Sequence, residues 1–178
     1  EPSITKSCVA PPGAHSALTV KVVTMRGDNA HEGTRIAATA EDTQAFGEEL
    51  GAALEAGDLV ILDGPLGAGK TTFTQGIARG MQVKGRVTSP TFVIAREHPS
   101  TVGGPALIHV DAYRLLDHSD DPLGELDSLD LDTEIEDAVV VAEWGGDFME
   151  RLADACLVVS INRDSDDDVR EFSWKWVT

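Results

Sequence analysis

The sequence predicts an α/β domain with a central sheet of mixed direction. Early in the chain, an apolar run at 59–62 is followed by a glycine-rich loop and then by a helix-type pattern. Later, two hairpin-like pairs of apolar runs occur, the first formed by 92–95 and 106–110 and the second by 157–162 and 171–177. Alternating strands and helices favour parallel pairing and hairpins give antiparallel pairing, so both are expected in one sheet.

The N-terminal part of the chain divides into a poorly patterned segment and the start of the domain. Residues 1–33 are expected to form a leader or arm, and residues 34–178 the domain. After a short strand, Thr39 has the residue type of an N-cap for a helix that runs to about Ala56, because acidic residues fill its first turn and Gly57 supplies a stop. The apolar positions expected to form one stripe on this helix are Phe46, Leu50, Ala53 and Leu54.

A phosphate-binding pattern, G-x-x-x-x-G-K-[ST], occurs after the run at 59–62 as Gly64-Pro65-Leu66-Gly67-Ala68-Gly69-Lys70-Thr71. Glycines let the backbone form a nest of N–H groups around phosphate oxygens. Lys70 then reaches the β- and γ-phosphates, and the Thr71 hydroxyl binds Mg²⁺. A helix should follow as far as Met81, because apolar residues recur every four positions, and its N-terminus favours anions. The chain is therefore predicted to bind ATP or GTP.

Two acidic residues end apolar runs elsewhere in the chain. Asp111 follows 106–110, and Glu143 follows 138–142. Ligands of open α/β sheets bind at the carboxyl ends of the strands, so each acid is a candidate for the second ligand that a Mg²⁺-nucleotide site needs. The residues leave open which of the two has this role, and whether either is only a solvated strand end or a helix cap. Trp144 is either a lid or part of the core.

Neighbouring polar residues each allow two interpretations. His109 lies on the same strand face as Asp111, and it either positions that acid or a water, or is an uncharged strand histidine bonded to backbone. Arg114 either stabilises a transferred phosphoryl group or pairs with the acidic, weakly helical segment 115–137. The segment Ser89-Pro90-Thr91 is either a switch-like strand near the γ-phosphate or the ordinary start of a strand.

Composition argues against several classes of function. Asp and Glu number 31 and Lys and Arg 14, so the formal net charge of −17 opposes direct binding to nucleic acid or to an anionic membrane. Cys8 and Cys156 lack metal-ligand spacing. No apolar stretch approaches the roughly 20 residues that cross a bilayer, and the first residues lack a signal-peptide hydrophobic region. A cytoplasmic protein is expected.

In their order and spacing over roughly residues 34–162, four motifs resemble the TsaE (YjeE) family of small bacterial ATPases. They are Gly67-Ala68-Gly69-Lys70-Thr71-Thr72-Phe73, Thr88-Ser89-Pro90-Thr91-Phe92, His109-Val110-Asp111-Ala112-Tyr113-Arg114-Leu115 and Glu143-Trp144. With the phosphate loop, the resemblance implies a three-layer P-loop NTPase-like fold, with a mixed, mainly parallel central sheet and a C-terminal antiparallel hairpin.

The resemblance also implies an activity. The implied protein is an ATPase with ATP and Mg²⁺ as cofactors. It supports turnover of a TsaB–TsaD complex in the N6-threonylcarbamoylation of tRNA adenosine 37, and it does not itself transfer the threonylcarbamoyl group. The expected catalytic residues are Lys70, Asp111 and Glu143, and the expected metal ligands are Thr71, Asp111 and Glu143. The expected nucleotide-binding residues are Leu66, Gly67, Ala68, Gly69, Lys70, Thr71, Thr72 and Trp144. The adenine is expected near the start of the helix at 39–56.

Two other functions use the same loop. A small-molecule kinase usually carries an arginine-bearing lid, whereas the arginines between the loop and Glu143 form no cluster in the sequence. A nucleotide-dependent binding module, in which hydrolysis is incidental, would use the same residues to change a partner surface. The sequence does not exclude the binding module.

Overall fold

The structure, a computed structural model, describes residues 32–90, 93–118, 120–121, 124–125, 128, 133–144, 155–164 and 167–177. Residues 1–31 of the expected leader, Thr91 and Phe92 of the S-P-T-F motif, and much of the acidic segment 115–137 lie outside the described residues. The strands are β1 (Glu32–Ala37), β2 (Leu59–Asp63), β3 (Ala95–His98), β4 (Leu107–Asp111), β5 (Val139–Glu143), β6 (Cys156–Asn162) and β7 (Arg170–Val177). The helices are α2 (Ala40–Ala53), α3 (Lys70–Met81), α4 (Ala112–His118) and the short 3₁₀ turn η1 (Ile135–Asp137).

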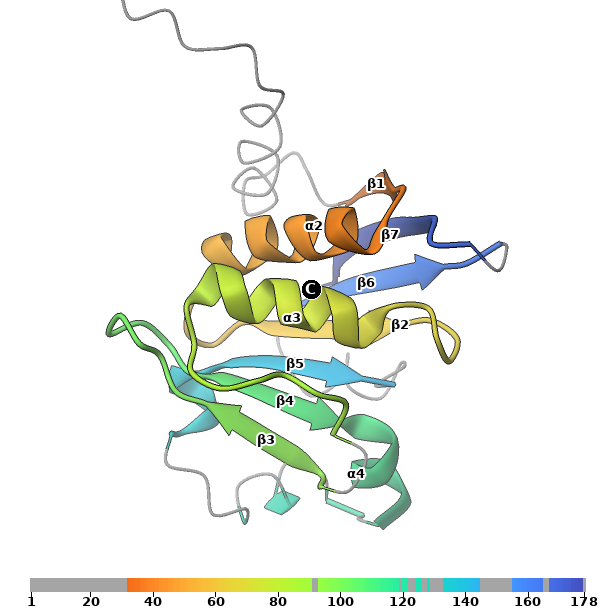
Figure 1. The fold of residues 1–178 in the computed structure, drawn as a ribbon. Coiled ribbons are helices and arrows are strands. Elements are labelled where there is room, and N and C mark those ends of the chain that lie inside the picture. Colours follow the sequence, from red (N-terminus) through yellow and green to blue (C-terminus); the bar gives the residue numbers. More distant parts are fainter. Residues whose placement is uncertain are drawn as a thin grey trace, which may run out of the picture.

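The described strands form one sheet in the order β1-β7-β6-β2-β5-β4-β3 (Figure 1). The four central strands β6, β2, β5 and β4 are parallel to one another. At one end β3 pairs antiparallel with β4, and at the other the hairpin β6–β7 is antiparallel, as is the pairing of β1 with β7. The predicted α/β fold, with a mixed, mainly parallel sheet and a C-terminal antiparallel hairpin, is confirmed.

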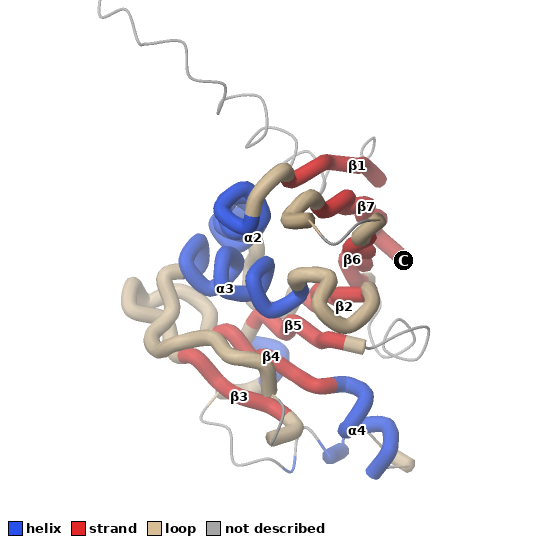
Figure 2. Tube along the Cα trace, turned by 45° about the vertical axis from the view of Figure 1, so that its right-hand side comes forward, coloured by secondary structure: helices blue, strands red, loops and turns tan. Residues whose placement is uncertain are grey.

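Side chains on both faces of the central strands are buried. Along β2, Val60 and Leu62 belong to one apolar cluster, and Leu59 and Ile61 belong to the other. Figures 1 and 2 show α2 and α3 side by side on one face, where they cover the first cluster. Leu115 of α4 packs into the second cluster. Burial on both faces explains why β2 and β5 appear in the sequence as unbroken apolar runs.

Helices α2 and α3 pack backbone against backbone. A Cβ atom added to Gly51 would lie 2.2 Å from the Ile77 carbonyl oxygen, and one added to Gly76 would lie 2.2 Å from the Gln44 carbonyl oxygen. Since real side chains do not tolerate such distances, only glycine permits this approach. The contact fixes α3, which carries the phosphate loop at its N-terminus, against α2.

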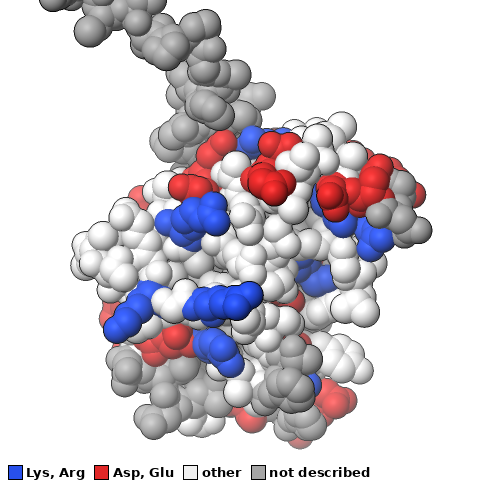
Figure 3. All heavy atoms as spheres, in the orientation of Figure 1, with Lys and Arg blue, Asp and Glu red and all other residues white. Residues whose placement is uncertain are grey.

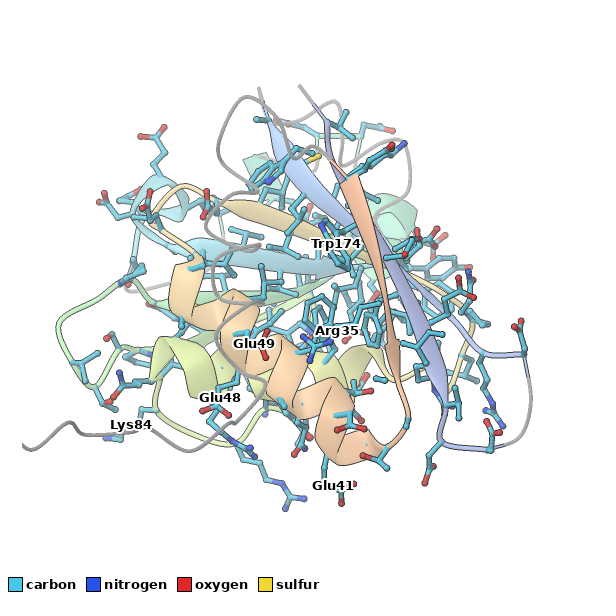
Figure 4. The ribbon with its side chains drawn as sticks, turned by 90° about the horizontal axis from the view of Figure 1, so that it is seen from above. Arg35, Glu41, Glu48, Glu49, Lys84 and Trp174 are labelled. Carbon is cyan, nitrogen blue, oxygen red and sulfur yellow. The ribbon has the colours of Figure 1, made fainter. Side chains whose placement is uncertain are left out.

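Contacts at the start and end of α2 fix its position. The predicted N-cap is confirmed, because the Thr39 hydroxyl accepts a hydrogen bond from the Asp42 N–H at 3.1 Å. The helix ends at Ala53, earlier than the predicted Ala56, because Leu54 adopts an extended conformation and turns into the core. Figure 4 shows Arg35 of β1 directed toward Glu49 of α2, and their side chains form an ion pair at 3.0 Å.

Two elements differ from the sequence prediction in position. Strand β3 lies three residues later than the predicted strand at 92–95, because the charged residues Arg96 and Glu97 are accommodated at the edge of the sheet. Helix α4 begins at Ala112, immediately after β4 and before the segment expected to be helical. Within the described ranges, no helix is long and apolar enough to cross a membrane.

Candidate functional site

The loop between β2 and α3 has a backbone conformation that requires glycine. Gly64, Gly67 and Gly69 have φ values of 151°, 77° and 102°. Gly69 is the N-cap of α3, so the helix begins at Lys70. The first N–H groups of a helix have no intrahelical partner, and together with the helix dipole they form an anion site. The loop predicted from the sequence therefore has the geometry of a phosphate-binding loop.

Lys70 is buried in this loop, with 6% of its surface exposed. Its Nζ donates hydrogen bonds to the Gly64 carbonyl at 2.8 Å and the Pro65 carbonyl at 3.0 Å. The same ammonium lies 3.9 Å from the centroid of the Trp144 ring, which is a cation–π contact. Burial lowers the pKa of Lys70, and the negative charge of Glu143 opposes this shift. Lys70 therefore links the phosphate loop to the end of β5.

The two strand-end acids lie on neighbouring strands, with Asp111 opposite Glu143 in the β4–β5 register. Glu143 is 4% exposed, and its Oε1 lies 2.9 Å from Nε2 of the fully buried His109. Nδ1 of His109 is buried and has no hydrogen-bond partner among the described residues. The histidine thus contacts Glu143, on the adjacent strand, and this contact orients the carboxylate.

Asp111 has different contacts from Glu143. Its Oδ1 accepts a hydrogen bond from the Arg114 N–H at 3.3 Å, and its Oδ2 lies 3.5 Å from Arg114 Nε. It therefore caps the first turn of α4 and pairs with an arginine of that helix. Arg114 pairs with Asp111, three residues earlier. Pairing with the acidic segment, one of the two alternatives for Arg114, is not among the described contacts.

A pocket of about 400 Å³ opens at the phosphate loop. It brings together eight of the predicted site residues, namely Leu66, Gly67, Gly69, Lys70, Thr71, Thr72, Glu143 and Trp144. The described lining does not include Ala68, which is fully buried, or Asp111. Ser89, the first residue of the switch-like segment, also lines the pocket. The loop and the end of β5 therefore form one site.

Two residues of the pocket were missed by the sequence analysis. Asp168 and Arg170 line it from the β6–β7 hairpin, and the Arg170 Nε donates to the Ala68 carbonyl in the loop at 2.9 Å. These partners are 102 residues apart. No motif signals Arg170, and only the pairing of β7 beside β6 brings it to the phosphate loop.

A smaller cavity of about 40 Å³ adjoins this pocket at the start of α2. Ala40 and Thr43 line it, opposite Asp168 and Arg170. The Thr43 hydroxyl is buried and has no hydrogen-bond partner among the described residues. Since buried polar atoms are normally paired, this oxygen is available to a water or to a polar ligand group. The cavity lies at the start of the helix predicted at 39–56, where the adenine is expected.

The donor groups present fit a nucleoside triphosphate and Mg²⁺. Backbone N–H groups and Lys70 suit phosphate oxygens, and the pocket extends past Thr72 toward α2. The Thr71 hydroxyl and the Glu143 carboxylate lie in the same pocket, and both are hard oxygen ligands of the kind that Mg²⁺ prefers. The arrangement can bind a charged phosphate chain beside a fixed carboxylate.

Comparison with known proteins gives one family. The family described as "Threonylcarbamoyl adenosine biosynthesis protein TsaE" matches residues 37–172. The chain is 56% identical to the tRNA threonylcarbamoyladenosine biosynthesis protein TsaE of Mycobacterium bovis over 146 residues, which are 81% of this chain and 87% of the relative. It is 55% identical to the Mycobacterium leprae protein of the same name over 147 residues, 82% and 91% of the two chains.

A solved structure is similar to the fold. The crystal structure of Bacillus subtilis YdiB matches with a TM-score of 0.64 and 29% sequence identity, and the match covers 83% of this chain and 86% of that one. The matched region of the family, residues 37–172, includes the phosphate loop, His109, Glu143 and Arg170. The pocket therefore lies within the part of the chain that these proteins share.

Proposed function

The chain belongs to the TsaE family of tRNA threonylcarbamoyladenosine biosynthesis proteins, and from this membership we propose that it is a Mg²⁺-dependent ATPase. Its nucleotide cycle supports turnover of a TsaB–TsaD complex that modifies tRNA adenosine 37. The transfer of the threonylcarbamoyl group and the binding of tRNA are assigned to those partners. We expect the protein to act in the cytoplasm, where the tRNA that this complex modifies is found.

One observation carries this proposal. The pocket that contains the phosphate loop also contains a buried carboxylate, Glu143, held by His109 at 2.9 Å. Binding alone needs the loop, whereas hydrolysis also needs a group that orients the attacking water. A carboxylate fixed at the edge of the phosphate site meets that need. The contact with His109 limits the orientations that the carboxylate can adopt, which favours preorganisation.

Each residue then has a proposed role. The loop backbone from Leu66 to Gly69, with Thr72, holds the phosphates, and Lys70 stabilises the charge that develops on them. Thr71 and Glu143 hold Mg²⁺, Glu143 also orients the attacking water, and Asp111 is a further acid at the adjacent strand end. Bound Mg²⁺ supplies positive charge to the phosphate oxygens. Trp144 covers the site beside Lys70.

The nucleoside is proposed to lie between the start of α2 and the β6–β7 hairpin. In this direction the pocket continues from Thr72 to Ala40 and Thr43, opposite Asp168. The Thr43 hydroxyl, which has no partner in the described part of the chain, then bonds a polar group of the nucleoside or a water bound with it. This assignment gives Arg170 a structural role, because it supports the loop through the Ala68 carbonyl.

The test is ATP hydrolysis by the chain alone and with TsaB–TsaD, together with formation of the modified adenosine. Lys70→Ala and Glu143→Gln are expected to abolish both partner-stimulated hydrolysis and modification. Glu171→Gln, which neutralises an exposed acid on β7, is the matched control and should behave as wild type.

Other outcomes distinguish the alternatives. Modification that proceeds equally well with Lys70→Ala and Glu143→Gln contradicts the proposal. Nucleotide-dependent complex formation and modification that survive the loss of hydrolysis indicate a binding module. ATP-dependent phosphorylation of a small metabolite indicates a kinase.

A further inference from the structure

Charge is distributed unevenly along this acidic chain. It contains 31 Asp and Glu residues, yet none occurs between Gly64 and Arg96. That stretch instead carries five cations, which are Lys70, Arg79, Lys84, Arg86 and Arg96. Lys70 belongs to the nucleotide site. The other four lie outside the pocket at the phosphate loop, so nucleotide binding does not account for them.

These four cations lie on neighbouring elements of one face. Arg79 is in the last turn of α3, Lys84 and Arg86 are in the connection to β3, and Arg96 is in β3 itself, and all four are exposed. Figure 3 shows Lys and Arg side chains grouped over this region, with acidic side chains above them over α2 and others directly below them. We refer to Arg79, Lys84, Arg86 and Arg96 as the basic face.

The basic face borders a polar hollow of about 490 Å³. Arg79 and Arg86 line it together with three amide side chains, those of Gln44, Gln75 and Gln82. Two of the amides are fixed in place, since Gln44 Nε2 donates to Gln75 Oε1 at 3.2 Å and Gln75 Nε2 donates to the Val87 carbonyl at 3.1 Å. Donor groups and cations therefore surround a cavity with a defined shape.

The connection that carries Lys84 and Arg86 is held against the sheet. The Lys84 N–H donates to the Pro99 carbonyl at 2.8 Å, and the Lys84 carbonyl oxygen lies 3.2 Å from Nδ1 of the buried His98. The Thr101 N–H donates to the Gln82 carbonyl at 2.9 Å. A surface ordered before binding loses less conformational entropy when a partner docks. The backbone that carries the basic face is thus preorganised.

We propose that the basic face docks an acidic surface of a protein partner. Arg79 already lies 3.7 Å from the Glu48 carboxylate, and the other three cations, on a body of net charge −17, suit a compact acidic patch, because screening confines their attraction to about 8–10 Å. A long RNA backbone would extend past the basic face and meet the acidic remainder of the molecule. The described lining of the hollow also contains no aromatic side chain on which an exposed base would stack.

The proposal rests on the proposed function for the identity of the partner, which is the TsaB–TsaD complex. The position of the basic face favours communication with the nucleotide site. Arg86 lies only three residues before Ser89, which lines the nucleotide pocket. A partner held at Lys84 and Arg86 would therefore contact the same connection that reaches the bound nucleotide.

Charge reversal tests the assignment. Lys84→Glu and Arg86→Glu are compared with Lys175→Glu, an equal change of charge at an exposed position on β7. Binding to the TsaB–TsaD heterodimer is measured by biolayer interferometry at about 50 mM and about 300 mM salt. Each basic-face variant should bind at least about tenfold more weakly at the lower salt, and this difference should shrink at the higher salt as screening increases. Lys175→Glu should stay within about twofold of wild type.

Binding of a fluorescent ATP analogue, which should be unchanged in all three variants, verifies that they fold. If wild type binds TsaB–TsaD and all variants bind equally well, the basic face is not the docking surface, although the proposed function stands. If wild type does not bind TsaB–TsaD, both proposals fail. If instead Lys84→Glu and Arg86→Glu lose binding to tRNA in a filter assay, the occupant is RNA and the protein-partner proposal is overturned.

Discussion

Nε2 of His109 lies 2.9 Å from Oε1 of Glu143, and both side chains are buried on adjacent parallel strands. A hydrogen bond to a buried carboxylate restricts the orientation of that carboxylate. A carboxylate that orients a water molecule for attack depends on this restriction. His109 does not line the nucleotide pocket, so its effect on hydrolysis must act through Glu143. It is a positioning residue for the proposed carboxylate.

Removal of this histidine should affect hydrolysis more than binding. His109→Ala leaves the Glu143 carboxylate without this hydrogen bond, and we expect the hydrolysis rate to fall about tenfold to a hundredfold. The affinity for a fluorescent ATP analogue should change less than about threefold, because the phosphate loop is unaltered. His109→Gln, which can again donate to the carboxylate, should recover part of the rate. An unchanged rate in His109→Ala would contradict the positioning role.

Trp144 should report on nucleotide binding. Its ring lies over the Lys70 ammonium at 3.9 Å, and the proposed role of Lys70 requires this ammonium to contact phosphates. Addition of ATP should therefore change the tryptophan emission of the wild-type protein, and Trp144→Phe should abolish most of the change. Trp174→Phe, made within the β1–β7 region away from the loop, is the control and should keep the response. A response that depends on Trp174 instead would contradict the prediction.

The contact between α2 and α3 should tolerate no side chain. Gly51→Ala would place a Cβ 2.2 Å from the Ile77 carbonyl oxygen, and the helices must move apart. We expect a loss of about 2 kcal/mol or more in the free energy of unfolding, and a melting temperature lower by about 5 °C or more. Gly104→Ala serves as the control, because its Cβ would meet only the Ser100 side chain, at 3.5 Å. Equal melting temperatures for the two variants would refute the backbone contact.

Stability should depend on pH through His98. Burial lowers the pKa of His98 from its usual value of 6.5, the hydrogen bond to the Lys84 carbonyl opposes this shift, and the nearby His109 and Arg96 add to it. The unfolded chain then takes up a proton near pH 6.5 that the folded chain does not, so stability falls as the pH drops through this value. The contribution of this one group is at most about 1.4 kcal/mol per pH unit.

Urea unfolding between about pH 5.5 and pH 7.5 measures this effect. His98→Asn does not titrate, and its free energy of unfolding should decrease less toward acid pH than that of wild type. The difference between the two curves of unfolding free energy against pH gives the contribution of His98. Parallel curves would show that His98 takes up its proton equally in the folded and unfolded states.

Local patterns predicted the central part of the fold. The run at 59–62 and the loop with Lys70 identified β2, the turn and α3, because each of these elements is determined by neighbours in sequence. Strand β3 was placed too early, since the charges of Arg96 and Glu97 conceal an edge strand. The period of two along β4 put His109 and Asp111 on one face, but the hydrogen-bond partner of His109, Glu143, lies on an adjacent strand.

The part of the pocket formed across long sequence separations was not predicted. Arg170 reaches the loop only because β7 pairs with β6, which in turn pairs with β2. Neither Arg170 nor Asp168 belongs to a local motif, and an Asp-rich turn gives no sign that it borders a nucleotide pocket. Contacts of this kind follow from strand order, which local propensity does not encode.

The strand order has a consequence for biosynthesis. Strand β1 is made early, yet it pairs with β7, and Glu32 lies opposite Lys175 in that pairing. During translation β1 therefore cannot join the sheet until residues 170–177 have been made. Until then its unpaired edge is accessible to other chains. Arg170 also arrives only with this last strand. The nascent chain should accordingly acquire a fully supported phosphate loop only after β7 has been made, and ribosome-bound intermediates should bind ATP poorly until β7 emerges.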